Sequence, residues 1–107
     1  MEITTLDGAP TVPFNIDGRI MFSCSRAEVI HLTLMPGNKL EMHDNLADVV
    51  FYMLQGSLFL LLEAGEKEIK TDSCLEIKRG ILRGWENRRS EKARMLVIKL
   101  PESTGSR

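Results

Sequence analysis

Closely spaced turn signals are the feature that most constrains the fold of this chain. They lie at Asp17-Gly18, Pro36-Gly37, Gly56, Ala64-Gly65, Asp72-Ser73, Gly80 and Gly84. Glycine, proline and aspartate favour the backbone conformations that reverse a chain. Because the intervals between these signals are short, they leave little room for helices, and the sequence predicts strands instead.

Apolar and β-branched residues fill the intervals between the turns, as is typical of strands. The predicted strands span residues 19–23, 28–34, 39–43, 49–54, 57–63, 67–71, 75–78, 81–86 and 93–100. Many short strands at regular spacing indicate an all-β sandwich or barrel.

Two of the predicted strands are apolar on both faces. The segments "VVFYML" and "SLFLLL" show no alternation with polar residues, so each needs cover on both sides. One face of the first segment fills the barrel, and we expect Phe51 and Met53 on it. The other face, with Val50, Tyr52 and Leu54, is too apolar to stay in water, which predicts a homodimer.

Length, composition and charge restrict the possible partners. A chain of 107 residues with 43% hydrophobic and 27% charged residues is typical of one globular domain, here residues 1–107. A net charge of -1 provides no field that would attract nucleic acid or anionic lipid. No apolar run approaches the roughly 20 residues that span a bilayer, and no secretory signal is evident. We therefore expect a cytoplasmic protein without nucleic-acid or membrane partners.

The predicted domain has three parts. Residues 1–27 form an N-terminal arm and strand, residues 28–100 a barrel core, and residues 101–107 a flexible tail without apolar side chains after Pro101. Cys24 and Cys74 lie far apart and belong to no CxxC pair, so we expect two reduced thiols.

The spacing of several residues resembles the first motif of the cupins, which are small conserved β-barrels of the jelly-roll type. In that motif a glycine precedes His-x-His by five residues, and a glutamate and a second glycine follow. Gly37, His43 and Gly56 fit this spacing. Asn45 stands at the second histidine position, and Val49 stands at the glutamate position.

The second cupin motif, Pro-x-Gly, two residues, His, three residues and Asn, resembles "KRGILRGWEN". Gly80 and Asn87 keep their places, whereas Lys78 replaces the proline and Arg83 the histidine. The resemblance covers roughly residues 28 to 100. It implies a single-domain cupin jelly-roll barrel, but it does not select a function, because cupins include enzymes, sugar-binding modules and storage proteins.

The resemblance also implies where a metal would bind, and these positions are altered. Of four ligand positions only His43 keeps its residue type; valine cannot coordinate a metal, and arginine repels a divalent cation. Asp48, beside the lost glutamate position, or Glu41, nominally on the same strand face as His43, would be needed to rescue the site. We therefore expect no metal and no other cofactor.

Arginine at a former ligand position favours binding of a small polar or acidic molecule inside the barrel. A guanidinium in a walled cavity suits a carboxylate or phosphate, and His43 would supply a second hydrogen bond. Trp85 shares a strand face with Arg83 and either walls the ligand or plugs the barrel. An internal ion pair of Arg83 with Glu41 or Asp48 is the competing hypothesis.

Two other function classes stay open. The first is a small enzyme: a metal-dependent oxygenase with an altered ligand set, or an isomerase or lyase that uses His43 as general base. The second is a structural or regulatory dimer module without catalysis, which acts through the strands that are apolar on both faces.

Overall fold

The computed structural model describes residues 1–13 and 15–101, and every regular element among them is a strand. The predicted tail therefore lies outside the described residues from position 102 onward. In chain order the strands are β1 (Asp17–Ser23), β2 (Glu28–Leu34), β3 (Lys39–His43), β4 (Asp48–Gln55), β5 (Leu58–Leu62), β6 (Gly65–Ile69), β7 (Cys74–Ile77), β8 (Arg83–Glu86) and β9 (Ala93–Leu100). None of the described segments forms a helix that could cross a membrane.

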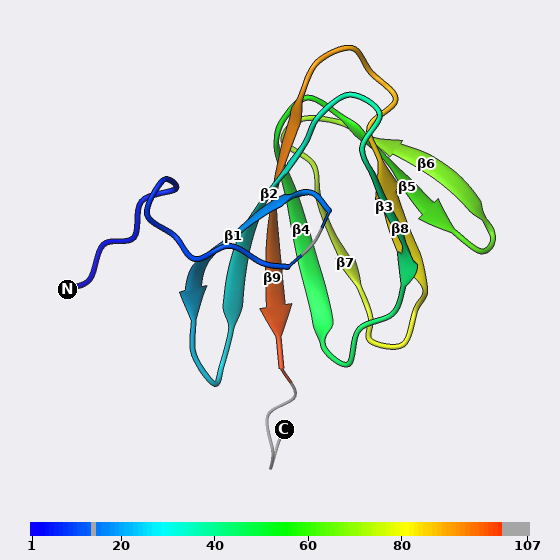
Figure 1. Ribbon diagram of the computed structural model, residues 1–107. Coiled ribbons are helices and arrows are strands. Elements are labelled where there is room, and N and C mark those ends of the chain that lie inside the picture. The colour runs from blue at the N-terminus through cyan, green and yellow to red at the C-terminus, as the bar shows by residue number, and fades with distance from the viewer. Residues whose placement is uncertain (14, 102–107) are drawn as a thin grey trace.

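The strands form two antiparallel sheets that face each other (Figure 1). One sheet has the order β1-β2-β9-β4-β7, and the other has the order β3-β8-β5-β6. Strands β4 and β9 pair over almost their whole length, and β9 also pairs with β2, so the first and last strands of the barrel core lie side by side in the larger sheet. The predicted all-β architecture is confirmed.

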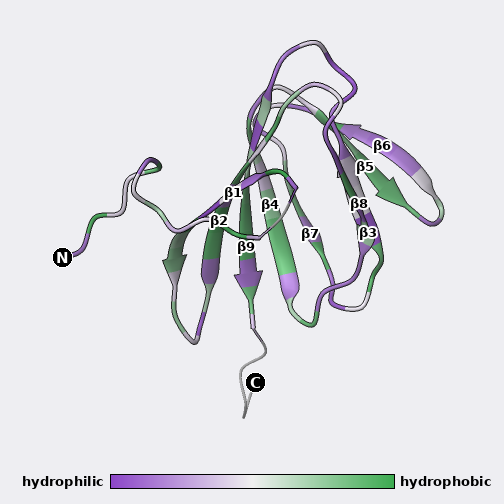
Figure 2. Ribbon diagram, in the orientation of Figure 1, coloured by the Kyte–Doolittle hydropathy of each residue, from purple (hydrophilic) through white to green (hydrophobic). Residues whose placement is uncertain are grey.

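The core lies between the two sheets and follows the period of two that strands impose. On β4, Val49, Phe51 and Met53 are buried, whereas Val50 and Tyr52 on the opposite face are half-buried. Hydrophobic residues dominate β4 and β5, whereas β6, at the edge of the smaller sheet, is mostly hydrophilic (Figure 2). The prediction that Phe51 and Met53 face the interior of the barrel is therefore confirmed.

Two predicted turn signals lie inside strands. Asp17 and Gly18 belong to β1, and Gly84 belongs to β8. Both glycines allow close packing: a Cβ on Gly18 would clash with Cγ2 of Val12, and one on Gly84 would lie 2.6 Å from the carbonyl oxygen of Leu40. The predictions were wrong because glycine in a strand often marks a close approach of another segment.

The β3–β8 ladder contains a bulge that decides which side chains face the core. Leu40 pairs with Trp85 and His43 pairs with Arg83, so two residues of β3 stand opposite the single residue Gly84. An extra residue reverses the face on which the following side chains project. His43 therefore shares a face with Leu40 and Arg83, although it lies three positions after Leu40 and would project on the opposite face of a regular strand.

Asn87 forms hydrogen bonds that connect two segments at the end of the barrel away from the bulge. Its side-chain nitrogen donates to the carbonyl oxygens of Leu34 and Glu91, at 2.9 Å each, and its oxygen accepts from the backbone N–H of Arg89 at 2.9 Å. Asn87 is 1% exposed. The asparagine of the second motif thus joins the end of β2 to the loop between β8 and β9.

Candidate functional site

A pocket with a volume of about 40 Å³ opens between the two sheets at the end of the barrel where β3 and β9 terminate. The larger sheet and the smaller sheet both contribute to its wall. The lining residues are Ile30, Leu32, Leu40, His43, Asn45, Phe51, Arg83, Trp85, Val97 and Lys99. Apolar side chains therefore surround a small group of polar ones.

Arg83 brings a positive charge into this wall from the first residue of β8. It is 2% exposed, and its Nη1 donates to the carbonyl oxygen of Ile81 at 3.2 Å. Among the residues that the structure describes, no carboxylate forms an ion pair with Arg83. Burial lowers the pKa of the Arg83 guanidinium, and the negative charge of Asp44 acts in the opposite direction. Arginine keeps its proton in proteins, so most of its donors remain available to an anion.

His43 faces Arg83 directly across the ladder. Residues opposite one another in an antiparallel pair have Cβ atoms about 4.5 to 5.5 Å apart. Nδ1 of His43 lies 3.0 Å from the carbonyl oxygen of Glu41. Because a carbonyl oxygen only accepts, Nδ1 carries the hydrogen, and Nε2 of the neutral ring keeps a lone pair. His43 is largely exposed at the pocket mouth, so the expected inward position holds only in part.

Trp85 and Phe51 form the aromatic part of the pocket. Their ring centroids are 5.0 Å apart with a 56° angle between planes, and Cζ of Arg83 lies 5.8 Å from the centre of the Phe51 ring. Trp85 is 1% exposed. Its Nε1 is buried without a hydrogen-bond partner among the described residues. A buried indole N–H usually has a partner, so Nε1 of Trp85 is a donor that the described residues leave unsatisfied.

Asn45 and Lys99 also line the pocket, and neither was predicted as a binding residue. The sequence marked Asn45 only as the replacement of a metal ligand. Its Oδ1 accepts from the backbone N–H of Ala47 at 3.0 Å, so its amide hydrogens are available to other partners. Lys99 projects from the inward face of β9, and its Nζ lies 3.7 Å from Glu28, its register partner on β2. Strand alternation from Val97 was the sequence signal that could have identified Lys99.

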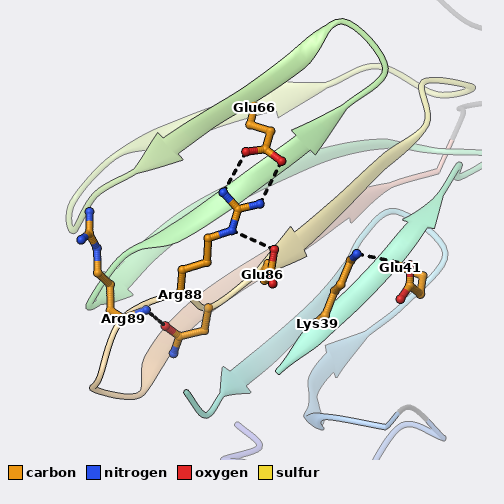
Figure 3. Close-up of polar contacts among 7 residues, drawn as sticks. Lys39, Glu41, Glu66, Glu86, Arg88 and Arg89 are labelled. Atoms are coloured by element: carbon orange, nitrogen blue, oxygen red, sulfur yellow. Dashed lines mark hydrogen bonds and ion pairs between the residues drawn. The ribbon is translucent and has the colours of Figure 1, made fainter. Parts of the chain in front are cut away.

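Glu41, Asp48 and Met53 do not line the pocket. Glu41 projects on the outer face of β3, where it lies 3.9 Å from Nζ of Lys39 (Figure 3). The expectation that it shares a face with His43 was wrong, because the bulge lies between them. Asp48 accepts from the backbone N–H of Arg79 at 2.9 Å. Met53 lies deeper in the core with no exposed surface.

The basic segment before β9 pairs with carboxylates on the smaller sheet. Arg88 donates to both oxygens of Glu66 at 2.8 Å and to Glu86 at 2.9 Å (Figure 3). Arg89 contacts Glu68 at 2.6 Å. These charges are exposed and compensated, so the segment forms a hydrated rim of ion pairs rather than an uncompensated basic patch.

The residues at the four positions that the cupin resemblance assigns to metal ligands do not fit a divalent metal. Val49 is buried in the core, and Arg83 would oppose a second positive charge in the same pocket. Within residues 1–13 and 15–101, no group of three or more His, Cys, Asp or Glu side chains has the arrangement of a metal site. Hydrogen-bond donors, rather than metal ligands, distinguish this pocket.

Comparison with known proteins identifies the fold. No protein-family model matches the sequence, and a search of curated proteins finds no match. Among solved structures, the polyketide cyclase RemF from Streptomyces resistomycificus has a TM-score of 0.83 and 17% identity, covering 98% of this chain and 82% of that one. A conserved protein from Klebsiella pneumoniae with a double-stranded β-helix domain has a TM-score of 0.80 and 16% identity, covering 98% of this chain and 94% of that one.

A cupin superfamily protein from Desulfitobacterium hafniense also matches, with a TM-score of 0.76 and 11% identity over 91% of this chain and 87% of that one. At such low identities the likeness concerns the fold alone. It agrees with the two sheets described above and with the two motif spacings in the sequence. The chain therefore has the cupin fold, a double-stranded β-helix.

Proposed function

We propose that the protein binds a small organic acid in the pocket, with Arg83 as the anion-binding residue. The observation that carries this proposal is a guanidinium that is 2% exposed and donates to one backbone carbonyl, but has no ion pair among the described residues. A buried charge without a partner destabilises a fold. A bound anion would supply the missing partner.

The neighbouring donors support the same assignment. The indole N–H of Trp85 is buried and unpaired in the described part of the chain, and the amide of Asn45 and the ammonium of Lys99 belong to the same wall. These groups donate hydrogen bonds, and a carboxylate accepts them at two oxygens. The alternative in which Glu41 or Asp48 neutralises Arg83 has no support, because these carboxylates contact Lys39, Lys78 and the Arg79 backbone instead.

Titration with a panel of small acids tests the proposal. The protein has a single tryptophan, so the indole N–H signal of Trp85 in a ¹⁵N-correlated NMR spectrum reports on the pocket directly. We expect acetate, glycolate or inorganic phosphate to shift this signal in a saturable manner. Arg83→Ala should abolish the shift, whereas Arg26→Ala, which removes an exposed arginine that does not line the pocket, should preserve it.

The absence of a saturable response to every acid in the panel would contradict the proposal. A response that persists unchanged in Arg83→Ala would show that the anion binds elsewhere. We expect Arg83→Ala to keep the fold, because Arg83 is the first residue of the short strand β8 and does not belong to the hydrophobic core cluster.

One observation favours a second candidate function, proton transfer by His43. The carbonyl oxygen of Glu41 holds the hydrogen on Nδ1, and this leaves Nε2 able to take a proton from a carbon next to a carbonyl group. The electron pair would move to the carbonyl oxygen, where Arg83 would stabilise the charge. Deuterium incorporation from D₂O into a bound keto acid, lost in His43→Phe, is the expected signature of this activity.

The proposal includes assembly as a homodimer through the outer face of the larger sheet. Phe22, Val29, Ile98 and Val50 occupy one row across β1, β2, β9 and β4 on this face, and Phe22 is 53% exposed. A second copy would cover this row by a self-complementary contact. Light scattering should give twice the chain mass at micromolar concentration, and Ile98→Lys should give the monomer mass. A wild-type monomer would contradict the assembly but not the binding site.

A further inference from the structure

We infer that the anion bound beside Arg83 is a carboxylate with a hydroxyl group on the adjacent carbon, that is, a short 2-hydroxy acid. This inference rests on the proposed function and specifies its ligand. Its basis is the pairing of the Arg83 guanidinium with one hydrogen-bond acceptor, His43 Nε2, at neighbouring positions of the pocket wall.

The first step is the distribution of donors and acceptors. Arg83, Trp85 and Lys99 can only donate hydrogen bonds. Oδ1 of Asn45 accepts one hydrogen bond, from the backbone N–H of Ala47, and keeps one lone pair. The carbonyl oxygen of Glu41 accepts the Nδ1 hydrogen of His43, so the neutral imidazole offers Nε2 as an acceptor. A carboxylate alone satisfies the donors but leaves this lone pair to water at the pocket mouth. A ligand that also carries a hydrogen-bond donor satisfies both.

The second step is the spacing of the two groups. His43 and Arg83 are direct cross-strand partners and both line the pocket, so their side chains start about 4.5 to 5.5 Å apart. Side chains that start this close together are able to contact adjacent parts of one small molecule. The donor that meets His43 therefore belongs next to the carboxylate, and not several carbons away.

The third step is the identity of that donor. An ammonium group would add a positive charge beside Arg83, which has no ion pair among the described residues, and like charges repel. A hydroxyl group is neutral and both donates and accepts. A pocket of about 40 Å³ has room for on the order of three water-sized groups, so it encloses a carboxylate and its neighbouring carbon while the remainder lies at the mouth.

Matched acids test this inference on the full chain. The probes are glycolate, acetate, 3-hydroxypropionate and glycine, and the readout is the dissociation constant from the Trp85 indole signal. We expect glycolate to bind about tenfold more tightly than acetate, the ratio that corresponds to about 1.4 kcal/mol for one additional hydrogen bond. The hydroxyl of 3-hydroxypropionate is one carbon too far away, so this acid should bind like acetate.

Two variants separate the roles of the side chains. His43→Phe removes Nε2 but keeps a ring at the exposed mouth, and it should bring the glycolate-to-acetate ratio close to one while acetate affinity stays within about twofold. Glu41→Ala is the matched control on the same strand. It keeps the backbone carbonyl that orients His43 and should preserve the tenfold ratio.

Four other outcomes of these binding experiments would each contradict a specific part of the inference. Equal affinity of the wild type for glycolate and acetate would overturn the hydroxyl assignment and leave the acid site in place. Tighter binding of glycine than of glycolate would overturn it in favour of an amino acid. A preference for glycolate that survives in His43→Phe would remove His43 from the site. A lack of response to all four compounds and to phosphate would overturn the proposed function itself.

Discussion

His43 and Arg83 lie directly opposite each other in the β3–β8 ladder, and the carbonyl oxygen that orients the imidazole belongs to the bulge that places the two residues on one face. The bulge thus sets both the position of the imidazole and the ring nitrogen that carries its hydrogen. Backbone irregularities of this kind often occur next to functional sites, where they redirect a side chain.

Arg83→Met should leave the protein as stable as the wild type or stabilise it by up to ~2 kcal/mol. The variant removes a buried charge that has one backbone partner and replaces it with an apolar side chain of similar length. Urea unfolding without added acid measures the difference. A loss of about 3 to 5 kcal/mol would show that Arg83 is paired with a buried carboxylate in the folded state.

Gly84→Ala should destabilise the protein by about 1 to 3 kcal/mol, the usual cost of forcing extra volume into a packed site. The new Cβ would lie 2.6 Å from the carbonyl oxygen of Leu40 and 3.0 Å from the backbone nitrogen of Met42. Both contacts are with backbone, so β3 would have to move away from β8. Thermal unfolding measures the loss. Gly8→Ala, in an exposed turn, is the control and should change stability by less than about 0.5 kcal/mol; an equal loss in both variants would argue against the clash.

Asn87→Ala should destabilise the protein by ~3 kcal/mol, because the carbonyl oxygens of Leu34 and Glu91 lose their donor at a site that is 1% exposed. Chemical denaturation measures the change. Asn15→Ala, which removes an exposed asparagine with one long contact of 3.5 Å, should have little effect. If Asn87→Ala were as stable as the wild type, water would have to replace the side chain without cost.

His31 should make stability depend on pH. It is 4% exposed on the outer face of the larger sheet, and Nε of Arg94 donates to its Nε2 at 3.1 Å. Burial, and then the charge of Arg94, lower the pKa of His31 below its usual 6.5; Asp17 acts in the opposite direction and Arg19 in the same one. Between the folded and unfolded pKa values the unfolded chain binds more protons, so stability is complete above about pH 6.5 and falls as the solution becomes more acidic.

Urea unfolding between pH 7.5 and pH 5 tests this dependence, and His31→Gln supplies the control, because glutamine can still accept from Arg94 but does not titrate. The free energy of unfolding should decrease less between pH 7.5 and pH 5 in His31→Gln than in the wild type. A variant that loses as much stability on acidification as the wild type would place the dependence on other groups.

The sequence predicted the strands well because short apolar runs between turn residues have few alternatives. It failed where tertiary contacts decide. Gly18 and Gly84 resemble turn signals, but each admits another segment of backbone or side chain within a strand. Residues Ile81 and Leu82 are apolar yet lie before β8, 44% and 38% exposed. Local composition carries no information about such contacts.

The same limit applies to the site. Arg83 and Trp85 were identified because strand alternation and motif spacing agree on β8. Glu41 was placed on the wrong face because the bulge in β3 has no signal in the sequence. It can be recognised only once the pairing with Gly84 on β8 is known. Lys99 was overlooked because a lysine near the end of a strand is usually a solvent-facing residue, although alternation from Val97 places it on the inward face of β9.

The bulge makes strand length, and not only residue type, a determinant of the pocket. If Met42 were deleted, Leu40, Glu41 and His43 would follow one another in strict alternation, and Gly84 would face a single residue. The imidazole would keep its side of the sheet while the carbonyl group that orients it would be displaced. A one-residue change in strand length would therefore remove the contact that fixes the hydrogen on Nδ1 of His43, while His43 stays on the same side of the sheet.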